Sequence, residues 1–152
     1  AVAVVALTDD GRICLVRQYR TALGRVTVEL PAGKLDPGED PLDCAVRELA
    51  EETDLTARRW DVLVDFFTSP GGTTEPLRIF LARDLTQAAE SFAREDEEAA
   101  MIYAWVSLTE ALDMVAAGRL HNPSAVLGIL AAHAARGRQW EGLRSPDAPW
   151  MR

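Results

Sequence analysis

The chain has 152 residues, 48% of them apolar and 26% charged, with a formal net charge of −8, which suits one globular domain over residues 1–152. The acidic balance argues against nucleic acid or a membrane surface as a partner, because both require a basic face. No apolar run approaches the roughly 18 to 20 residues that span a bilayer, and the two cysteines, Cys14 and Cys44, are expected to be buried, reduced thiols of a cytoplasmic protein.

Three strands are predicted before the first helix. AVAVVAL (1–7) and RICLVRQY (12–19) are rich in β-forming residues, and TDDG between them predicts a hairpin turn. VTVEL (26–30) alternates as a strand, whereas PAGKLDPGED (31–40) holds two Pro and two Gly and is predicted to be a loop. Because the sequence opens at Ala1, directly in a strand, we expect residues upstream to be missing from it.

Residues 41–53 are predicted to form a helix with an apolar stripe at the i, i+3, i+4, i+7 spacing: Leu42, Ala45, Val46 and Leu49. Glu48 and Glu52 fall side by side at the edge of this stripe, with Glu51 further out. Arg47 falls on the other flank. Like charges so placed repel, and a divalent cation such as Mg²⁺ removes the conflict because it takes several carboxylate oxygens. The alternative is a solvated face, since glutamate is a good helix former.

The second half of the chain predicts three strands and two helices. The strands are DVLVDFFT (61–68), LRIFLA (77–82) and MIYAWV (101–106), and SPGGTTE (69–75) is a loop between the first two. The helix boundaries are a capping box of Ser107 with Glu110, an end near Gly118, a start at Asn122 and Pro123, and an end at Gly137. The tail from Arg138 is expected to pack irregularly. This order indicates a mixed sheet with helices on both faces rather than a regular βαβ alternation.

The spacing around the first helix resembles a known motif. Gly33 is followed after five residues by Glu39 and after seven more by RELAEETDL (47–55). Over residues 33–55 this resembles the Nudix box of the Nudix hydrolases, G-x5-E-x7-R-E-U-x-E-E-x-G-U, where U is apolar. Asp54 stands where the family has its last Gly, just past the helix end. Aspartate adopts the left-handed conformation more easily than most residues, so we expect the turn to survive.

The resemblance implies a Nudix α/β/α sandwich, an α/β (α+β) fold with a central mixed β-sheet. It also implies hydrolysis of a nucleoside diphosphate linked to another group, with two or three Mg²⁺ or Mn²⁺ ions. The implied metal ligands are three carboxylates and one backbone carbonyl: Glu48, Glu51, Glu52 and Ala32. Glu48 and Glu52 are implied to be catalytic, and Glu39 and Arg47 to orient the loop and the helix.

Two further stretches resemble the ADP-ribose pyrophosphatase branch of the family. In SPGGTTE, the residues Pro70, Gly71 and Glu75 match a substrate loop. Glu75 would accept a hydrogen bond from a ribose hydroxyl, although the stretch is also an ordinary turn. VRQYR (16–20) resembles a strand end that carries Arg20 toward the diphosphate, whose oxygens suit a guanidinium fork.

VELPAG (28–33) resembles the same branch and adds Glu29 and Gly33 as substrate residues. Glu29 either touches substrate or pairs with a neighbouring arginine. The acidic run REDEEAA (94–100) precedes a strand, and in the branch a loop here supplies a glutamate that acts as base or helps to bind metal and water. Glu98 fits that place best and Glu97 is the second choice. A solvated acidic loop is the alternative.

The expected function is Mg²⁺-dependent hydrolysis of ADP-ribose to AMP and ribose 5-phosphate by a homodimer. Two alternatives stay open. One is a Nudix pyrophosphatase for another nucleoside diphosphate sugar or a dinucleotide, since pocket residues outside the box decide the substrate. The other is a non-catalytic module that senses ADP-ribose, although such a module should have lost the metal glutamates.

Overall fold

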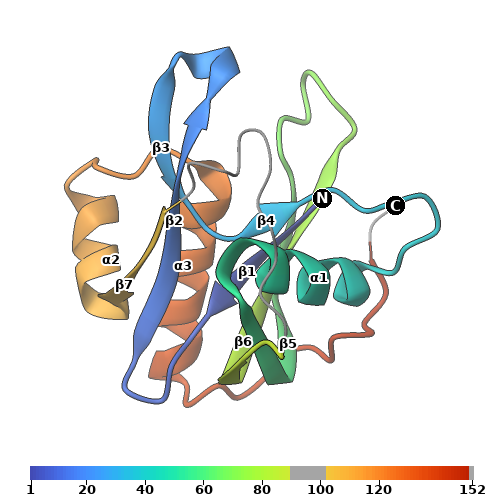
Figure 1. The fold of residues 1–152 in the computed structure, drawn as a ribbon, viewed down its shortest axis with the longest axis vertical. Helices are drawn as coiled ribbons and strands as arrows, with labels where there is room; N and C mark the ends of the chain where they lie inside the picture. Colours follow the sequence, from blue (N-terminus) through green and yellow to red (C-terminus); the bar gives the residue numbers. More distant parts are fainter. Residues whose placement is uncertain (90–101, 151–152) are drawn as a thin grey trace.

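The computed structural model describes residues 1–89 and 102–150, and Figure 1 shows their arrangement. In chain order the elements are β1 (Val2–Ala6), β2 (Arg12–Arg20), the short 3₁₀ helix η1 (Thr21–Leu23), β3 (Arg25–Glu29), β4 (Ala32–Gly33), α1 (Pro41–Thr53), β5 (Leu55–Phe67), β6 (Pro76–Gln87), β7 (Ile102–Ser107), α2 (Leu108–Ala116) and α3 (Pro123–Gly137). None of the helices in these ranges has the length and apolar character needed to cross a bilayer.

The strands form two sheets. One is mixed, in the order β4-β1-β6-β5, and within it β1 and β6 run parallel while the other neighbours are antiparallel. The other is antiparallel, in the order β3-β2-β7. The predicted mixed sheet is therefore present, and a second sheet stands beside it.

The predicted turn between the first two strands is present, with the Thr8 N–H donating to the Arg12 carbonyl at 2.9 Å, but β1 and β2 do not pair with each other as a hairpin. β1 pairs with β4 and β6, whereas β2 pairs with β3 and β7. A single bridge between Leu7 and Ile13 joins the two strands at the turn. The residues of a turn do not indicate whether the strands on either side pair with each other or with strands elsewhere in the chain.

The side chains of β1 are buried on both faces of the mixed sheet. Successive side chains on a strand point to opposite faces. Val2 and Val4 belong to the core that includes Leu49 of α1, whereas Ala3 and Val5 belong to the core formed with residues of α2 and α3. Helices therefore cover both faces of this sheet, as the sequence predicts (Figure 1).

β5 and β6 are longer than predicted. The sequence places them at 61–68 and 77–82, but they run over Leu55–Phe67 and Pro76–Gln87. The additional residues, 55–60 of β5 and 83–87 of β6, form the lower halves of these strands in Figure 1. They carry charged residues without apolar alternation and pair with each other. The loop 69–75 is found as predicted, while the predicted loop 31–40 includes the two residues of β4.

The predicted helix ends are confirmed. Asp54 ends α1 in the left-handed conformation, with φ of 56°, and its N–H donates to the Ala50 carbonyl at 2.8 Å. Ser107 and Glu110 form the predicted capping box of α2. The Asn122 side chain accepts from the N–H of Ala125 at the start of α3.

Residues 138–150, the described part of the tail after α3, contain no helix or strand and are held by a buried ion pair. Arg78 of β6 is 1% exposed and makes a two-fold contact with Asp65 of β5, at 2.7 and 2.9 Å. The remaining Arg78 donors reach the carbonyls of Ala148 and Pro149, and Arg144 reaches Asp65 at 2.8 Å. We call residues 144–150 the C-terminal strap.

Candidate active site

Gly33 lies against the carboxylate of Glu48. A Cβ placed on Gly33 would overlap the carboxylate atoms of Glu48. Glu48 is only 8% exposed and belongs to α1, whereas Gly33 belongs to β4. The first residue of the motif is therefore a glycine because the glutamate occupies the space that any side chain would need.

Glu52 lies one turn further along α1 and is 4% exposed. Its Oε2 accepts a hydrogen bond from the backbone N–H of Ala32 at 3.1 Å, which ties the helix to β4. Burial, together with the nearby charge of Glu52, raises the pKa of the Cys14 thiol to about 12. Burial and the neighbouring glutamates Glu39 and Glu48 likewise raise the pKa of Cys44 to about 12.

Arg47 gathers three carboxylates around one guanidinium group. Its Nε and Nη2 each donate to a different oxygen of Glu39 at 2.9 Å. Its Nη1 donates to Glu48 at 2.8 Å and to Glu51 at 3.1 Å. The hydrogen bond from Arg47 lowers the pKa of Glu39 to about 2. These contacts join the loop residue Glu39 to α1, and the role of Glu39 and Arg47 in orienting the loop and the helix stays a prediction.

The buried side of α1 differs from the predicted stripe. Val46 is 38% exposed, whereas Cys44 is fully buried. The helix is turned so that Glu48 and Glu52 lie within its buried side rather than at its edge. The side chain of Arg47, which the sequence predicts on the other flank, reaches Glu48 and Glu51.

The donor set fits a hard divalent cation in chemistry, because carboxylate and carbonyl oxygens are what Mg²⁺ and Ca²⁺ take. The Gly33 opening also leaves room for the Glu48 carboxylate beside β4. Within residues 1–89 and 102–150, however, no three acidic, His or Cys side chains are gathered as a ready-made metal site. Glu48 and Glu51 share Arg47 instead, so a cation would compete with that guanidinium for their oxygens.

Arg20 and Glu29 form a second group. Arg20 donates to both carboxylate oxygens of Glu29, at 2.9 and 2.7 Å, and Thr27 donates to the same carboxylate. Burial alone would raise the pKa of Glu29, but these hydrogen bonds outweigh it and hold the pKa below its usual value. Of the two roles open for Glu29, the structure contains the pairing with an arginine.

The remaining predicted residues lie apart from these groups or outside the described ranges. Pro70 and Gly71 are exposed in the β5–β6 loop, and Glu75 at its end accepts a hydrogen bond from Thr68 at 3.2 Å. This loop and the β2–β3 hairpin project at the same end of the molecule (Figure 1). Glu97 and Glu98 lie outside the described residues.

Sequence reasoning missed two residues that hold Glu29. Thr27 stands two positions before Glu29 on β3, and residues two apart share a strand face. The spacing in the sequence could therefore have predicted this contact. Asn122 also hydrogen-bonds the Glu29 side chain, but it belongs to the start of α3. Only the tertiary fold brings it there.

A family model for the NUDIX domain matches residues 1–125. The chain belongs to the Nudix family. The matched range covers both sheets and α1, so the arrangement of Gly33, Glu48 and Glu52 belongs to a Nudix box.

Two relatives of this Nudix chain are ADP-ribose pyrophosphatases. The one from Mycobacterium tuberculosis is 46% identical over 135 residues, which are 88% of this chain and 65% of the relative. The one from Bacillus subtilis is 40% identical over 129 residues, 85% of this chain and 69% of the relative. The chain thus spans about two thirds of the length of these relatives.

A solved structure described as an ADP compounds hydrolase has the same fold. It matches with a TM-score of 0.71 at 21% identity, covering 90% of this chain and 72% of that chain. The expected α/β/α Nudix fold is confirmed.

Proposed function

We propose that this protein hydrolyses the diphosphate of ADP-ribose to AMP and ribose 5-phosphate. The observation that carries the proposal is the 46% identity to an ADP-ribose pyrophosphatase across 88% of this chain. The packed Nudix box supports it, because the buried Glu48 and Glu52 are the groups that a metal-dependent hydrolase needs.

The residues that would hold a divalent cation are Glu48, Glu51 and Glu52, with the carbonyl of Ala32. A bound cation neutralises charge on diphosphate oxygens and helps to ionise water. Mg²⁺ is the expected ion, with Mn²⁺ as a substitute and two or three ions in all. The carboxylates are acceptors only, so they suit cations or hydroxyl donors and repel a bare diphosphate.

The chain's own residues orient this site. Arg47 fixes Glu48 and Glu51 from one side, and Ala32 fixes Glu52 from the other. Arg20 is the proposed contact to the diphosphate, with Glu29 holding its guanidinium in place. Preorganised charge of this kind reduces the reorganisation needed when charge develops in the transition state.

In the proposed substrate site, Pro70, Gly71 and Glu75 form the loop beside the ribose, and Gly33 lies under the diphosphate. Glu98 is the proposed loop base, with Glu97 as second choice. These roles follow from the resemblance to the ADP-ribose pyrophosphatase branch.

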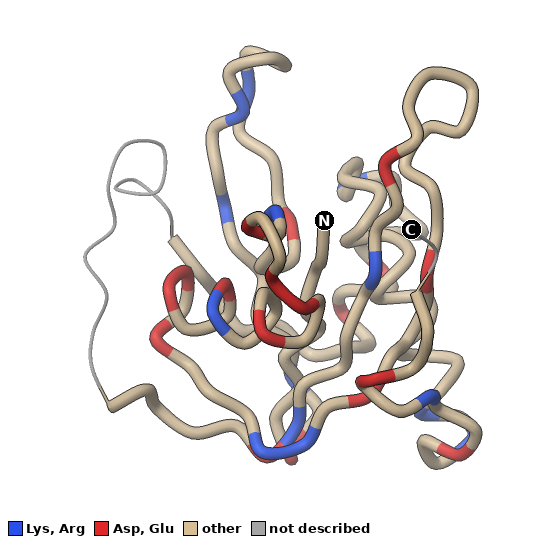
Figure 2. Tube along the Cα trace, turned by 90° about the vertical axis from the view of Figure 1, so that its right-hand side faces the viewer, with Lys and Arg blue, Asp and Glu red and all other residues tan. Residues whose placement is uncertain are grey.

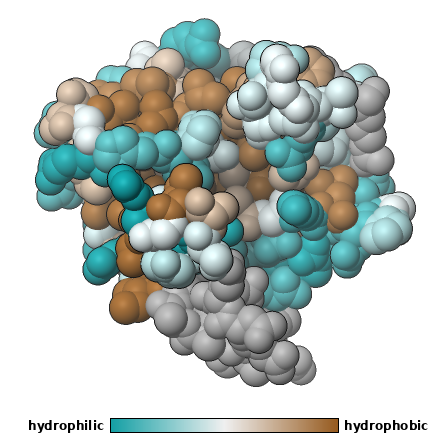
Figure 3. Space-filling view, turned by 90° about the horizontal axis from the view of Figure 1, so that it is seen from above, coloured by the Kyte–Doolittle hydropathy of each residue, from teal (hydrophilic) through white to brown (hydrophobic). Residues whose placement is uncertain are grey.

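A cytoplasmic homodimer is the proposed form of the protein. Three apolar side chains on the β2–β3 hairpin are exposed, Tyr19, Leu23 and Val26. Figure 3 views the end of the molecule from which this hairpin projects and shows apolar areas there beside hydrophilic ones. Sedimentation velocity tests the dimer, and a monomer at all concentrations would contradict it.

The deciding experiment is hydrolysis of a substrate panel with Mg²⁺, with the products identified: ADP-ribose, ADP-glucose, GDP-mannose, a dinucleoside polyphosphate and 8-oxo-dGTP. Dominant release of AMP from ADP-ribose is expected. Preference for another member would keep the metal helix and overturn the substrate. Tight ADP-ribose binding without turnover would favour a sensing module.

A further inference from the structure

The β2–β3 hairpin is basic in an otherwise acidic chain. Figure 2 shows basic positions along this hairpin, which projects at the top of the view. From Cys14 to Val28 the sequence contains three arginines and no acidic residue, although the whole chain has a formal net charge of −8. Glu29, at the end of β3, is the first carboxylate after these arginines in the chain.

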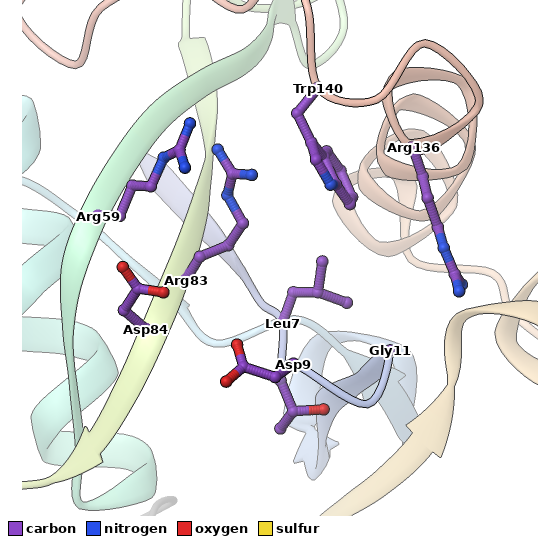
Figure 4. Close-up of a pocket in the computed structure, with 9 residues that line it drawn as sticks. Leu7, Asp9, Gly11, Arg59, Arg83, Asp84, Arg136 and Trp140 are labelled. Carbon is purple, nitrogen blue, oxygen red and sulfur yellow. The ribbon is translucent and has the colours of Figure 1, made fainter.

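The arginines at the β1–β2 turn are arranged differently. Arg83 and Arg136 both line a cavity of about 250 Å³ there (Figure 4). Trp140 and Leu7 stand between these two side chains. Arg83 also donates to Asp61 at 2.6 Å, so its charge is already matched. These arginines therefore do not converge on a single anion.

Arg20 of the hairpin is fixed by one buried carboxylate. Its Nε and Nη2 donate to different oxygens of Glu29, at 2.9 and 2.7 Å. Two parallel hydrogen bonds set both the plane and the direction of a guanidinium group. Glu29 is only 4% exposed, whereas the Arg20 side chain is 38% exposed. A rigid, buried acid thus holds an arginine that reaches the surface.

Asn122 uses both ends of its side-chain amide. Its Oδ1 accepts from the N–H of Ala125 at 3.0 Å and caps α3. The side chain also hydrogen-bonds Glu29, and an ionised carboxylate can only accept, so the amide Nδ2 is the donor. Among the usual N-cap residues, only asparagine offers an amide NH₂ group together with the capping oxygen. The start of α3 is therefore tied to the acid that holds Arg20.

Glu29 depends on such donors because it is buried. Burial acts to raise its pKa, and the hydrogen bonds from Arg20, Thr27 and Asn122 outweigh that effect. A buried carboxylate that loses a donor pays the cost of an unsatisfied charge and is held less firmly. Glu29 and Asn122 also both line a cavity of about 440 Å³ between β3 and the start of α3, so this group lies at an open part of the molecule.

We propose that Asn122 is a positioning residue for the hydrolysis of ADP-ribose, acting through Glu29 to hold the Arg20 guanidinium toward the diphosphate. The inference rests on the proposed function and on Arg20 as its phosphate contact. Asn122 does not itself touch the reacting atoms. Its loss should therefore weaken the binding of substrate and leave the chemical step nearly unchanged.

The test is steady-state kinetics of Asn122→Ser with ADP-ribose and Mg²⁺. Serine keeps an oxygen for the N–H of Ala125, so α3 stays capped, but the amide donor to Glu29 is lost. KM should rise about five-fold, with kcat changed by less than about two-fold. Ser107→Ala, which removes the cap of another helix, α2, is the control for lost helix capping and should keep the KM of the unchanged protein.

A double-mutant cycle with Arg20 separates positioning from general stability. Arg20→Gln should raise KM at least about ten-fold, and Asn122→Ser should add less than about two-fold in that background. A merely structural role would raise KM by the same factor in both backgrounds. Thr27→Val should behave like Asn122→Ser, and Thr27→Ser, which keeps the hydroxyl group, should restore a normal KM.

The Kd of ADP-ribose, measured by calorimetry with EDTA present, gives a second readout that needs no turnover. A normal KM in Asn122→Ser, an effect of equal size in the Arg20→Gln background, or a normal KM in Arg20→Gln would each overturn the inference and leave ADP-ribose hydrolysis standing. Binding of ADP-ribose without turnover would overturn the proposed activity instead. In that case a Kd raised about five-fold in Asn122→Ser would support the positioning role, and an equal Kd would overturn it.

Discussion

At the scale of single residues, contacts within the Nudix box restrict which residue types fit at its positions. Glu48 requires a glycine at 33, and Glu52 requires the backbone N–H of Ala32. Both glutamates are buried, and their burial costs free energy that hydrogen bonds must offset. Each of these contacts predicts the outcome of one substitution.

Glu52→Gln should lower kcat for ADP-ribose at least about 100-fold, because one charged ligand to the proposed cation is lost. The amide oxygen can still accept from Ala32, so the protein should keep its fold and its melting temperature. Steady-state kinetics and calorimetry measure both. Glu141→Gln, in the exposed tail, is the control. Near-normal turnover would remove Glu52 from the site.

Gly33→Ala should displace the Glu48 carboxylate from its place against β4. A misplacement of about 1 Å in a positioned group can cost about 100-fold in rate, so turnover should fall by about that factor. Gly137→Ala, where a Cβ meets no atom within 4 Å, is the matched control and should keep full activity. Equal activity of the two variants would show that the position of Glu48 is not critical.

At the scale of elements, Arg47 joins α1 to the loop before it. Glu39 belongs to that loop, and the Arg47 guanidinium also donates to the carbonyl of Lys34 at 3.2 Å. The loop is therefore held to the helix by charge as well as by hydrogen bonds. A carboxylate with a pKa of about 2 remains ionised at every physiological pH.

The Glu39–Arg47 contact should stabilise the fold in a pH-dependent way. The folded pKa of Glu39 is about 2, below its usual 4.5. Its contribution is therefore complete above about pH 4.5 and is lost as the pH falls toward 2. The difference in urea midpoint between the unchanged protein and Glu39→Gln should shrink over that window.

Arg47→Gln should remove the same pH-dependent difference, because it takes away the partner of Glu39. If the gap between the unchanged protein and Glu39→Gln were constant from pH 5 to about pH 2, the lowered pKa would not stabilise the fold.

Elements with strong local signals could be predicted from the sequence. α1 begins and ends as expected because Pro41 starts it, an apolar period runs through it and Asp54 adopts the left-handed conformation. The lower halves of β5 and β6 carry Arg59 and Arg83 without apolar alternation, so only their pairing with each other reveals them. β4 is two residues within a Pro- and Gly-rich stretch, which hides it.

The contacts around the proposed site were only partly predictable from the sequence. The resemblance to the Nudix box implies the proposed ligand residues, whereas the fork from Arg20 to Glu29 and its support by Asn122 depend on elements far apart in the chain. The exposure of Val46 also depends on how α1 sits on the sheet, which periodicity alone does not fix.

At the scale of the whole molecule, hydrogen bonds connect the C-terminal strap to the mixed sheet. Asp65 accepts from both Arg78 and Arg144, so one carboxylate holds a sheet arginine and the strap together. Burial would raise the pKa of Asp65, but these hydrogen bonds outweigh it and hold the pKa below its usual value.

Asp65→Ala should destabilise the protein by about 3–5 kcal/mol, because it leaves Arg78 buried without its partner. Urea unfolding measures the loss. The exposed pair of Asp10 and Arg12 is the control, and Asp10→Ala should lower the free energy of unfolding much less than Asp65→Ala does. The double change Asp65→Ala with Arg78→Met should be less harmful than Asp65→Ala alone. Equal costs for Asp65→Ala and Asp10→Ala would contradict the role of the strap.

The two cysteines lie in the core between α1 and the mixed sheet, one on β2 and one on α1, and both are fully buried. Alkylating reagents attack the thiolate, which a pKa of about 12 makes scarce at neutral pH. The folded protein should therefore resist iodoacetamide, and each labelling event should report a moment when the helix leaves the sheet. The rate at which iodoacetamide labels the two cysteines, followed by mass spectrometry, would therefore measure how often the Nudix helix opens, without an attached fluorophore or spin label.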